Sequence, residues 1–361
     1  MKKLQIGLVG LPQAGKTTFF NLLTGANLPT DFTGVGEVHT GIAVVPDPRL
    51  DFLAAYYKPH KTTYARIEFK DIPGTRRQES AARASQLLDE ARNADALVLV
   101  VRAFNNPAVS AVAGEPAPLR DLLDYRTELL LADMDAVEKR IDRIKNAKKI
   151  KKDAAEQLEL LERILNALAQ EQPVSSVPLS ESDRILLAGQ NFLSEKPLIL
   201  AVNLDEAQLL SGQYPERDEL LNYTAQHQIP VIEICAQIEM EINRLSPEEQ
   251  GEFLSELKLT ESGIGRLART AYERLGLLSF FTVGPDEVKA WTVRRGTPAR
   301  QAAGKVHSDF ERGFIRAEVF HFDDLKQLGS VAQVKEKGLF RLEGKDYPVK
   351  DGDIITFRFN I

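Results

Sequence analysis

The chain contains 361 residues, of which 43% are hydrophobic and 27% charged, and its formal net charge is −6 at pH 7. This length exceeds one ordinary hydrophobic core, so we expect two or three domains, and the composition excludes an intrinsically disordered protein. The negative charge argues against a protein that coats nucleic acid with its whole surface, although it leaves room for a local basic patch.

Cysteine content and hydropathy indicate the cellular compartment. Cys235 is the one cysteine, so no internal disulfide can form, and this suits a reducing environment. No apolar run approaches the ~20 residues of a membrane span, and no signal peptide is visible before the first strand. We expect a cytoplasmic monomer without a membrane partner. The five histidines are scattered and show no metal-ligand spacing, which argues against a zinc site.

The chain begins with a phosphate-binding motif. An apolar run from Ile6 to Val9 predicts a strand, Gly10 and Gly15-Lys16-Thr17 complete the pattern G-x-x-x-x-G-K-T, and apolar residues at helical spacing follow. This is a P-loop, in which glycines allow backbone N–H groups to point at phosphate oxygens. The positive N-terminal end of the helix adds to the attraction.

Individual residues of this loop have expected roles. Lys16 can reach the β- and γ-phosphates of a nucleotide, and the Thr17 hydroxyl can coordinate Mg²⁺. The residues expected to contact the nucleotide here are Gln13, Ala14, Gly15, Lys16, Thr17 and Thr18.

Residues 25–41 are rich in Gly, Thr and Pro and are predicted to form a loop. A loop at this place in P-loop hydrolases often senses the γ-phosphate. Thr33 and Thr40 are therefore candidates for contact with Mg²⁺, although both fit ordinary loop threonines equally well. We select Thr33 as a metal ligand together with Thr17.

A second nucleotide motif, D-x-x-G, follows the strand predicted by the alternating residues of ARIEFKD. Asp71 is expected to hold Mg²⁺ through a water molecule, and the Gly74 N–H to meet the γ-phosphate. Alone this motif is a weak signal, but its distance behind a P-loop makes it informative. We assign Lys16, Gly74 and Thr75 to catalysis.

Three later apolar runs, at residues 96–104, 197–203 and 229–236, are typical of buried strands. Because helical patterns separate them, they predict a mostly parallel sheet with helices on both faces, an α/β fold. Ligands bind beyond the carboxyl ends of the strands in such sheets. The residues that end the last two runs are therefore expected at the nucleotide: Asn203, Leu204, Glu206, Cys235, Ala236 and Gln237.

Apolar residues at heptad spacing predict an antiparallel, coiled-coil hairpin inserted between two of these strands. We expect the reversal within residues 146–153 and two arms of ~20 residues, each ~30 Å long. The seam comprises Leu130, Met134, Val137, Ile141 and Ile144 on the first arm and Leu158, Leu161, Leu165 and Leu168 on the second.

The reversal of the hairpin is rich in lysine. Lysines on helices commonly form a solvated face, but their concentration at a projecting tip also suits a surface that meets an anionic partner such as RNA. The lysines concerned are Lys145, Lys148, Lys149, Lys151 and Lys152.

The character of the sequence changes at Ser279. Short strands and turns around one predicted helix in ~80 residues suggest a small α+β module of the ubiquitin-like, β-grasp kind. Trp291 is most simply a core residue, with base stacking as the alternative. We divide the chain into a nucleotide-binding G-domain at 1–120 and 173–278, a hairpin at 121–172 and a C-terminal domain at 279–361.

Base choice is expected to depend on Asn203-Leu204-Asp205-Glu206. Guanine-specific P-loop proteins carry N-K-x-D at this place, and the aspartate takes the guanine N1 and N2 protons. Glu206 is one methylene longer and cannot make the same bidentate contact, so guanine preference should weaken. Leu204 offers an apolar contact to either purine.

With these motifs in place, the chain resembles the YchF/Obg-like ATPases of the translation-factor class of P-loop proteins. The resemblance covers essentially the full length, including PDPRL at 46–50, the N-x-x-E element and CAxxE at 235–239. The stretches FFTVGPDEVKAWTVRRGT, DFERGFIRAEV and LEGKDYPVKDGD are similar to the C-terminal TGS domain of the family. The resemblance implies a nucleotide hydrolase that binds ATP at least as well as GTP and associates with ribosomes.

Two loops depart from the family pattern. Residues 75–80 read TRRQES where the family is glycine-rich, and Val35 stands where a Mg²⁺-sensing threonine is expected, so Thr33 would have to substitute. Ras-like enzymes place a glutamine directly after D-x-x-G, whereas this chain has Thr75. We therefore expect slow hydrolysis that a partner stimulates.

Three functions fit these residues. The first is a Mg²⁺-dependent nucleotide hydrolase, using ATP or GTP, that acts as a ribosome- or RNA-associated switch through the hairpin lysines and the C-terminal domain. The second is a nucleotide-locked module that binds RNA or ribosomes with little hydrolysis. The third is an ordinary GTPase that tolerates Glu206.

Overall fold

A computed structural model of the chain describes residues 4–30, 37–74, 81–147 and 153–360. Contacts between residues divide the chain into two units. The first unit joins Met1–Gly41 with Glu68–Ile264, and the second joins Ile42–Ile67 with Gly265–Ile361. In the described residues, no helix is both long and apolar enough to cross a bilayer.

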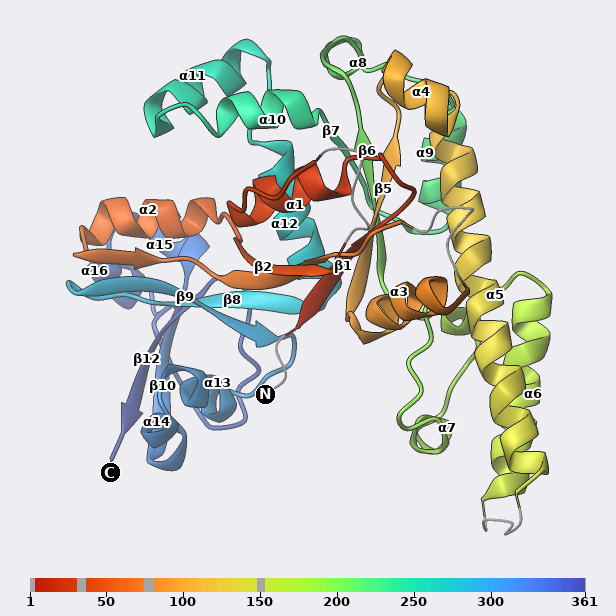
Figure 1. The fold of residues 1–361 in the computed structure, drawn as a ribbon. Coiled ribbons are helices and arrows are strands. Elements are labelled where there is room, and N and C mark those ends of the chain that lie inside the picture. Colours follow the sequence, from red (N-terminus) through yellow and green to blue (C-terminus); the bar gives the residue numbers. More distant parts are fainter. Residues whose placement is uncertain (1–3, 31–36, 75–80, 148–152, 361) are drawn as a thin grey trace. The chain divides into compact units, whose positions relative to one another are not determined.

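The first unit is built on a six-stranded sheet in which β4, β1, β5, β6 and β7 run parallel to their neighbours (Figure 1). β5 is buried at every position, as expected for a strand covered on both faces. The mostly parallel sheet predicted from the apolar runs is therefore confirmed. In spatial order the strands are β2 (His39–Val44), β4 (Arg66–Asp71), β1 (Gln5–Val9), β5 (Ala96–Arg102), β6 (Leu198–Asn203) and β7 (Val231–Ile234).

Helices separate the strands of this sheet along the chain. Local sequence explains several starts: Pro118 opens one helix at a position where no N–H partner is needed, and Ser180 and Asp205 form capping boxes. The helices are α1 (Lys16–Thr24), α3 (Ala81–Asn93), α4 (Pro107–Ala113), α5 (Pro118–Lys145), α6 (Ala154–Ala169), η1 (Val174–Ser176), α7 (Glu181–Leu186), α8 (Glu206–Ser211), α9 (Arg217–Gln226), α10 (Ala236–Ile242), α11 (Pro247–Glu256) and α12 (Gly263–Arg274), the last of which spans the division between the units.

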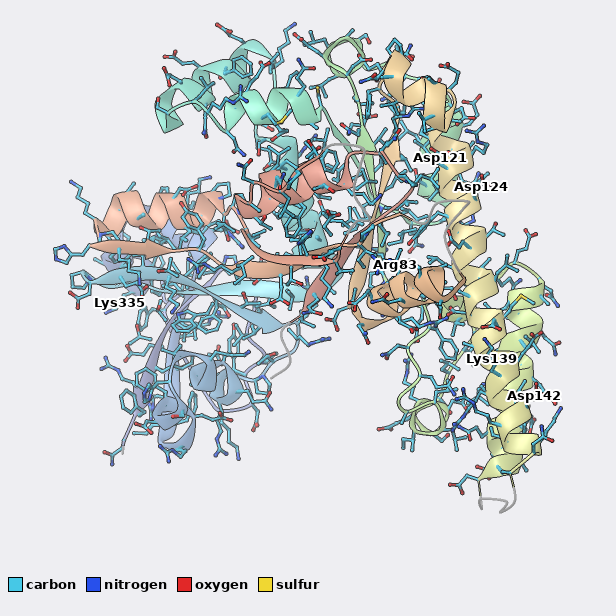
Figure 2. The ribbon with its side chains drawn as sticks, viewed as in Figure 1. Arg83, Asp121, Asp124, Lys139, Asp142 and Lys335 are labelled. Atoms are coloured by element: carbon cyan, nitrogen blue, oxygen red, sulfur yellow. The ribbon has the colours of Figure 1, made fainter. Side chains whose placement is uncertain are left out.

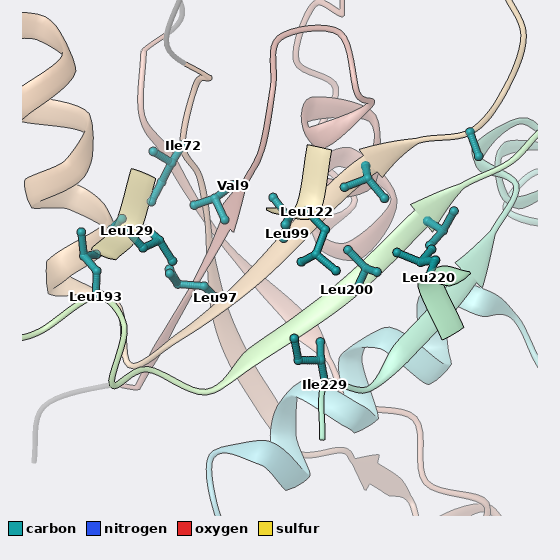
Figure 3. Close-up of a cluster of buried hydrophobic side chains, with 14 of the residues drawn as sticks. Val9, Ile72, Leu97, Leu99, Leu122, Leu129, Leu193, Leu200, Leu220 and Ile229 are labelled. Carbon is teal, nitrogen blue, oxygen red and sulfur yellow. The ribbon is translucent and has the colours of Figure 1, made fainter. Parts of the chain in front are cut away.

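One hydrophobic cluster of the first unit packs the first half of α5, together with α3 and α9, against the sheet. Figure 3 shows Leu122 and Leu129 of α5 among side chains of the central strands, such as Leu97, Leu99 and Leu200. Burial of such side chains is worth about 1.5–3 kcal/mol each before entropic costs. The root of α5 is thus part of the nucleotide-binding unit.

The second half of α5 packs on α6, which confirms the predicted hairpin (Figure 1). Val137 and Ile141 of α5 are buried against Leu161, Ile164 and Leu168 of α6. α5 ends at Lys145 and α6 begins at Ala154, so the reversal falls in the predicted segment.

The helices differ from the expected length of ~20 residues for each arm, because α5 has 28 residues and α6 has 16. The difference arises because the first half of α5 packs on the sheet and only its second half belongs to the seam. The C-terminal part of α5 ends in Lys145, which forms an ion pair with Glu162 at 3.2 Å.

The second unit contains a six-stranded mixed sheet. β8 lies between β12, with which it is parallel, and β9, with which it is antiparallel. Trp291 packs against its core and stacks on Phe280. In spatial order the strands are β11 (Arg341–Glu343), β10 (Phe314–His321), β12 (Asp353–Phe359), β8 (Leu277–Thr282), β9 (Glu287–Arg294) and β3 (Lys61–Thr63).

Four helices of the C-terminal segment replace the single helix expected there, and α2 joins them from earlier in the chain. Three of these helices are short, with five to seven residues, and side-chain caps at His307, His321 and Ser330 start them. The helices are α2 (Pro48–Tyr57), α13 (Ala299–Val306), α14 (Ser308–Arg312), α15 (Phe322–Leu328) and α16 (Val331–Glu336).

The grouping of residues 42–67 with this unit differs from the expected G-domain range of 1–120. β3 pairs with β9, and Arg49 next to Pro48 forms ion pairs with both Asp47 (2.8 Å) and Asp351 (2.7 Å). These contacts attach the segment to C-terminal residues. The full set of domain boundaries and the identification of residues 279–361 as a TGS domain remain predictions.

A buried carboxylate joins the hairpin to the sheet unit. Asp133 of α5 has a side chain that is 0% exposed. It accepts hydrogen bonds from Arg92 Nη1 (2.8 Å), from the backbone N–H groups of Leu193 (3.0 Å) and Ser194 (2.8 Å), and from Ser194 Oγ (2.8 Å). A buried charge is tolerated because both of its oxygens are paired.

We predict that Asp133→Ala lowers the free energy of unfolding of the first unit by about 3–5 kcal/mol, because it leaves the Arg92 guanidinium and two amides without their acceptor. Urea denaturation followed by circular dichroism measures this change. The matched control is Asp135→Ala, two residues along the same helix, whose exposed ion pair with Lys139 should contribute less than about 1 kcal/mol. Equal effects of the two substitutions would contradict the role assigned to Asp133.

Candidate nucleotide-binding site

The loop between β1 and α1 has the backbone of a phosphate cradle. Gly10, Gln13 and Gly15 adopt φ angles of 133°, 67° and 103°, a region that favours glycine. At Gly10 an added Cβ would lie 2.3 Å from the Val100 carbonyl oxygen, so a side chain is excluded there. Gln13 takes this conformation without being glycine. Its Oε1 is buried and has no hydrogen-bond partner among the residues that the structure describes.

Lys16 opens α1 and folds back over the loop. Its Nζ donates to the carbonyl oxygens of Gly10 (2.9 Å) and Leu11 (2.7 Å). The residue is 6% exposed, and this burial lowers the pKa of Lys16 to about 8, against the opposing attraction of Asp71. The ammonium group is thus held at the loop, where a phosphate oxygen could replace a carbonyl oxygen as its acceptor.

A buried amide ties the loop to the far strands of the sheet. Asn203, the last residue of β6, donates through Nδ2 to the Ala14 carbonyl oxygen (3.0 Å) and accepts through Oδ1 from the Ala236 N–H (3.3 Å). An added Cβ at Gly15 would lie 2.3 Å from this Nδ2, so glycine is needed for the approach. The structure therefore brings together Ala14, Gly15, Asn203 and Ala236, as the sequence predicts.

Thr17 and Asp71 meet at the ends of α1 and β4. The Thr17 hydroxyl donates to Asp71 Oδ2 at 2.7 Å, whereas the buried Oδ1 has no partner among the described residues. Burial raises the pKa of Asp71, against the lowering effects of the Thr17 hydrogen bond and the charges of Lys16 and His39.

Mg²⁺ prefers hard oxygen ligands, and a hydroxyl beside a carboxylate with one unpaired oxygen fits this preference. His39, at the start of β2, also lowers the pKa of Asp71 but belongs to neither nucleotide motif. The two residues lie 32 positions apart, so no local sequence pattern indicates this interaction.

Gly74 of the D-x-x-G motif lies against the P-loop backbone. An added Cβ would lie 2.4 Å from the Gly10 carbonyl oxygen and 2.7 Å from the Pro12 nitrogen. The two nucleotide motifs are therefore in direct contact, and a side chain at Gly74 would displace the loop.

The residues expected at the base differ in exposure. Asp205 caps α8: its carboxylate accepts from the Gln208 N–H (2.9 Å) and the Asn105 N–H (3.4 Å). Glu206, directly after it, is exposed. Leu204 is 3% exposed and packs in the core of the sheet, which argues against the expected apolar contact of its side chain with a purine.

The segment after β7 combines buried and exposed positions. Cys235 and Ala236 are buried, whereas Gln237 is exposed at the start of α10. Glu239 accepts a hydrogen bond from the Gly263 N–H (2.6 Å) at the first residue of α12. The CAxxE stretch thus contributes its backbone to the site and its glutamate to the start of a later helix.

A small cavity of about 20 Å³ separates the two nucleotide motifs from the hairpin helix. Gly10, Leu11 and Gly74 line one side, and Tyr125 and Glu128 of α5 line another. Burial raises the pKa of the Glu128 carboxyl. The volume suits about one water molecule.

Several predicted residues fall outside the described part of the chain. These are Thr33, Thr75 and the hairpin lysines Lys148, Lys149, Lys151 and Lys152. Thr18 lies in α1 and is partly buried, and Thr40 lies in β2 and is exposed.

Two family models match most of the chain. A family model described as "50S ribosome-binding GTPase" matches residues 5–204, and the model YchF-GTPase_C, described as a protein of unknown function, matches residues 277–360.

Individual relatives are similar throughout. The Ribosome-binding ATPase YchF of Bacillus subtilis (strain 168) is 41% identical, with 99% of this chain and 100% of the relative covered. The protein of the same name from Haemophilus ducreyi is also 41% identical, with 98% and 99% covered. The solved structure of the Schizosaccharomyces pombe YchF GTPase has a TM-score of 0.84 at 29% identity, with 99% of this chain and 98% of that chain covered.

We predict that Gly74→Ala weakens binding of a fluorescent ATP analogue by about tenfold or more, equivalent to at least 1.4 kcal/mol, because the new methyl group has to displace the P-loop backbone. Equilibrium titration of the purified protein measures this. Gly251→Ala in α11 is the matched control, since its Cβ would meet no atom within 4 Å. Wild-type affinity in the Gly74 variant would show that the contact is unimportant.

Proposed function

The chain belongs to the YchF family of P-loop proteins, and we propose that it binds and slowly hydrolyses a purine nucleoside triphosphate, as a switch associated with ribosomes or RNA. The observation that carries this proposal is the P-loop held by Asn203, with Lys16 above it and Thr17 beside Asp71. Phosphoryl transfer depends mainly on positioning and charge stabilisation, and these residues can provide both.

Binding is proposed to use the P-loop amides and Lys16 for the phosphates. Gln13, Ala14 and Gly15 belong to the same loop, and Thr17 and Thr18 belong to the first turn of α1. Lys16 would exchange its two carbonyl acceptors for phosphate oxygens, a charge-assisted and therefore stronger hydrogen bond. The Gly74 N–H, next to the loop, would meet the terminal phosphate.

Mg²⁺ is proposed as the cofactor. Thr17 and Asp71 would hold it, with Thr33 as a further candidate ligand, and the bound ion would neutralise charge on the phosphates. The protein supplies the oxygen ligands and excludes bulk water from Asp71, whose side chain is buried.

ATP is proposed to bind at least as well as GTP. Recognition of guanine in P-loop proteins needs a carboxylate at the base, and Asp205 is already committed to two backbone N–H groups. Glu206 is exposed and is longer than the usual aspartate. A site that makes imperfect hydrogen bonds to guanine loses its discrimination against adenine.

Slow hydrolysis is proposed from the residue that follows the D-x-x-G motif in the sequence. Thr75 follows D-x-x-G and lacks the amide with which a glutamine orients water. A partner that completes the site would increase turnover. The names of the bacterial relatives, which are ribosome-binding ATPases, support a ribosome as this partner and a cytoplasmic location.

The purified protein is expected to hydrolyse ATP in a Mg²⁺-dependent reaction that ribosomes accelerate, and unlabelled ATP should displace a fluorescent ATP analogue at least as well as GTP does. Phosphate release and competition titrations measure these properties. Absence of turnover with ribosomes, but with intact binding, would indicate the nucleotide-locked module. A strong GTP preference would indicate an ordinary GTPase.

The hairpin lysines are proposed to contact RNA of the ribosome. Replacing Lys148, Lys149, Lys151 and Lys152 together by glutamine should weaken ribosome binding and lower its dependence on salt, because each phosphate contact contributes to the salt slope. Sedimentation at several salt concentrations measures both. A variant with four exposed lysines replaced elsewhere is the control, and an unchanged salt slope in the hairpin variant would refute the contact.

A further inference from the structure

A second polar pocket lies in the first unit, away from the P-loop residues. It has a volume of about 520 Å³ and is bordered by α3, α5 and the loop of residues 188–192. Three arginines line it: Arg92 from α3, and Arg140 and Arg143 from α5. None of its lining residues belongs to the proposed nucleotide site.

The two arginines of α5 lie on the helix face that bears Asp133. Positions 133, 136, 140 and 143 follow helical spacing of three and four residues, which places their side chains along one face. Val137 and Ile141, on the adjoining part of the helix surface, pack against α6. The arginines therefore border the hydrophobic seam at the side of the pocket.

The three arginines differ in their partners. Arg92 is committed to Asp133, to the Ala132 carbonyl oxygen and to the Asn191 carbonyl oxygen. Arg140 and Arg143 have neither an ion pair nor a hydrogen-bond acceptor within the part of the chain that the structure describes. The Nε of Arg140 is buried and unpaired.

Other groups of the lining can add to an anion site. Asn93, Gln190 and Asn191 bring neutral amides that can donate hydrogen bonds. Asp89 is the one acidic residue among the described lining residues. The guanidinium groups of Arg140 and Arg143 therefore give the lining a positive charge in excess of this carboxylate. A planar guanidinium matches the oxygens of a phosphate group, which can accept two parallel hydrogen bonds from it.

We propose that this pocket is a second phosphate-binding site, in which Arg140 and Arg143 hold a backbone phosphate of RNA. The proposal rests on the RNA association proposed above and assigns part of it to the root of the hairpin instead of its tip. The alternative source of the same chemistry is a small phosphorylated compound, which the experiment distinguishes.

The test measures binding of a fluorescent single-stranded RNA oligonucleotide to the full chain by anisotropy. Arg140→Gln and Arg143→Gln should each weaken binding about three- to tenfold. The double variant should reduce the slope of log affinity against log salt by about 0.7, the value for the one phosphate contact that is lost. Unchanged affinity and slope would overturn the assignment to RNA.

Lys139→Gln is the matched control. Lys139 lies on the same helix (Figure 2), is exposed and pairs with Asp135, and it does not line the pocket. Its removal takes away the same charge and should leave RNA binding near the wild-type value. An effect as large as that of the arginines would show a diffuse response to charge and would overturn the site.

Conservative variants separate geometry from charge and from folding. Arg140→Lys with Arg143→Lys should restore the salt slope but only part of the affinity, because lysine cannot form the bidentate contact. Arg143 is exposed, so its glutamine variant tests the proposal without disturbing buried groups. Binding of a fluorescent ATP analogue should stay at the wild-type level in all of these variants.

The source of the phosphate is tested with inorganic pyrophosphate. It is titrated into protein whose P-loop is saturated with a non-hydrolysable ATP analogue. If the double variant loses pyrophosphate binding but binds RNA like the wild-type protein, the pocket binds phosphate. Its ligand is then a small phosphorylated compound and not RNA. If the double variant keeps both pyrophosphate binding and RNA binding, the assignment of the pocket as a phosphate-binding site is wrong. Failure of ATP binding in the wild-type protein would instead refute the proposed function.

Discussion

The candidate nucleotide site depends on one buried amide. Asn203 ends β6 and connects the carbonyl group of Ala14 with the N–H group of Ala236. A buried amide is stable only when its donor and its acceptor are both paired. The parallel order β1-β5-β6-β7 carries the P-loop and the loop after β7 to the same edge, and the missing side chain of Gly15 allows the amide to approach.

Much of this arrangement could be predicted from the sequence because it depends on local signals. The P-loop is defined by contiguous residues, and continuous apolar runs such as 96–104 identify buried strands. Parallel strands then place the ends of those runs together whatever the details of packing. The heptad seam of the hairpin is equally local, and it therefore predicts the reversal between Lys145 and Ala154.

The features that the sequence does not predict depend on contacts between segments that are distant in the chain. Lys61–Thr63 has no apolar alternation, so its pairing with β9 could not be read from its own residues. The motif N-L-D-E does not reveal that Leu204 points into the core or that Asp205 serves as a helix cap. In the sequence, Asp133 resembles an ordinary charged residue on the surface of a helix. Only the fold shows that Arg92, Leu193 and Ser194 donate hydrogen bonds to its carboxylate.

The continuity of α5 has a mechanical consequence. Tyr125 and Glu128 border the cavity beside Gly10 and Gly74, while Lys145 ends the same helix. Asp133 anchors the helix between these two positions. At a rise of 1.5 Å per residue, Glu128 and Lys145 lie about 25 Å apart along the helix. The surroundings of the cavity and the position of the hairpin end are therefore set by one continuous helix, which is packed on the sheet in its first half and on α6 in its second half.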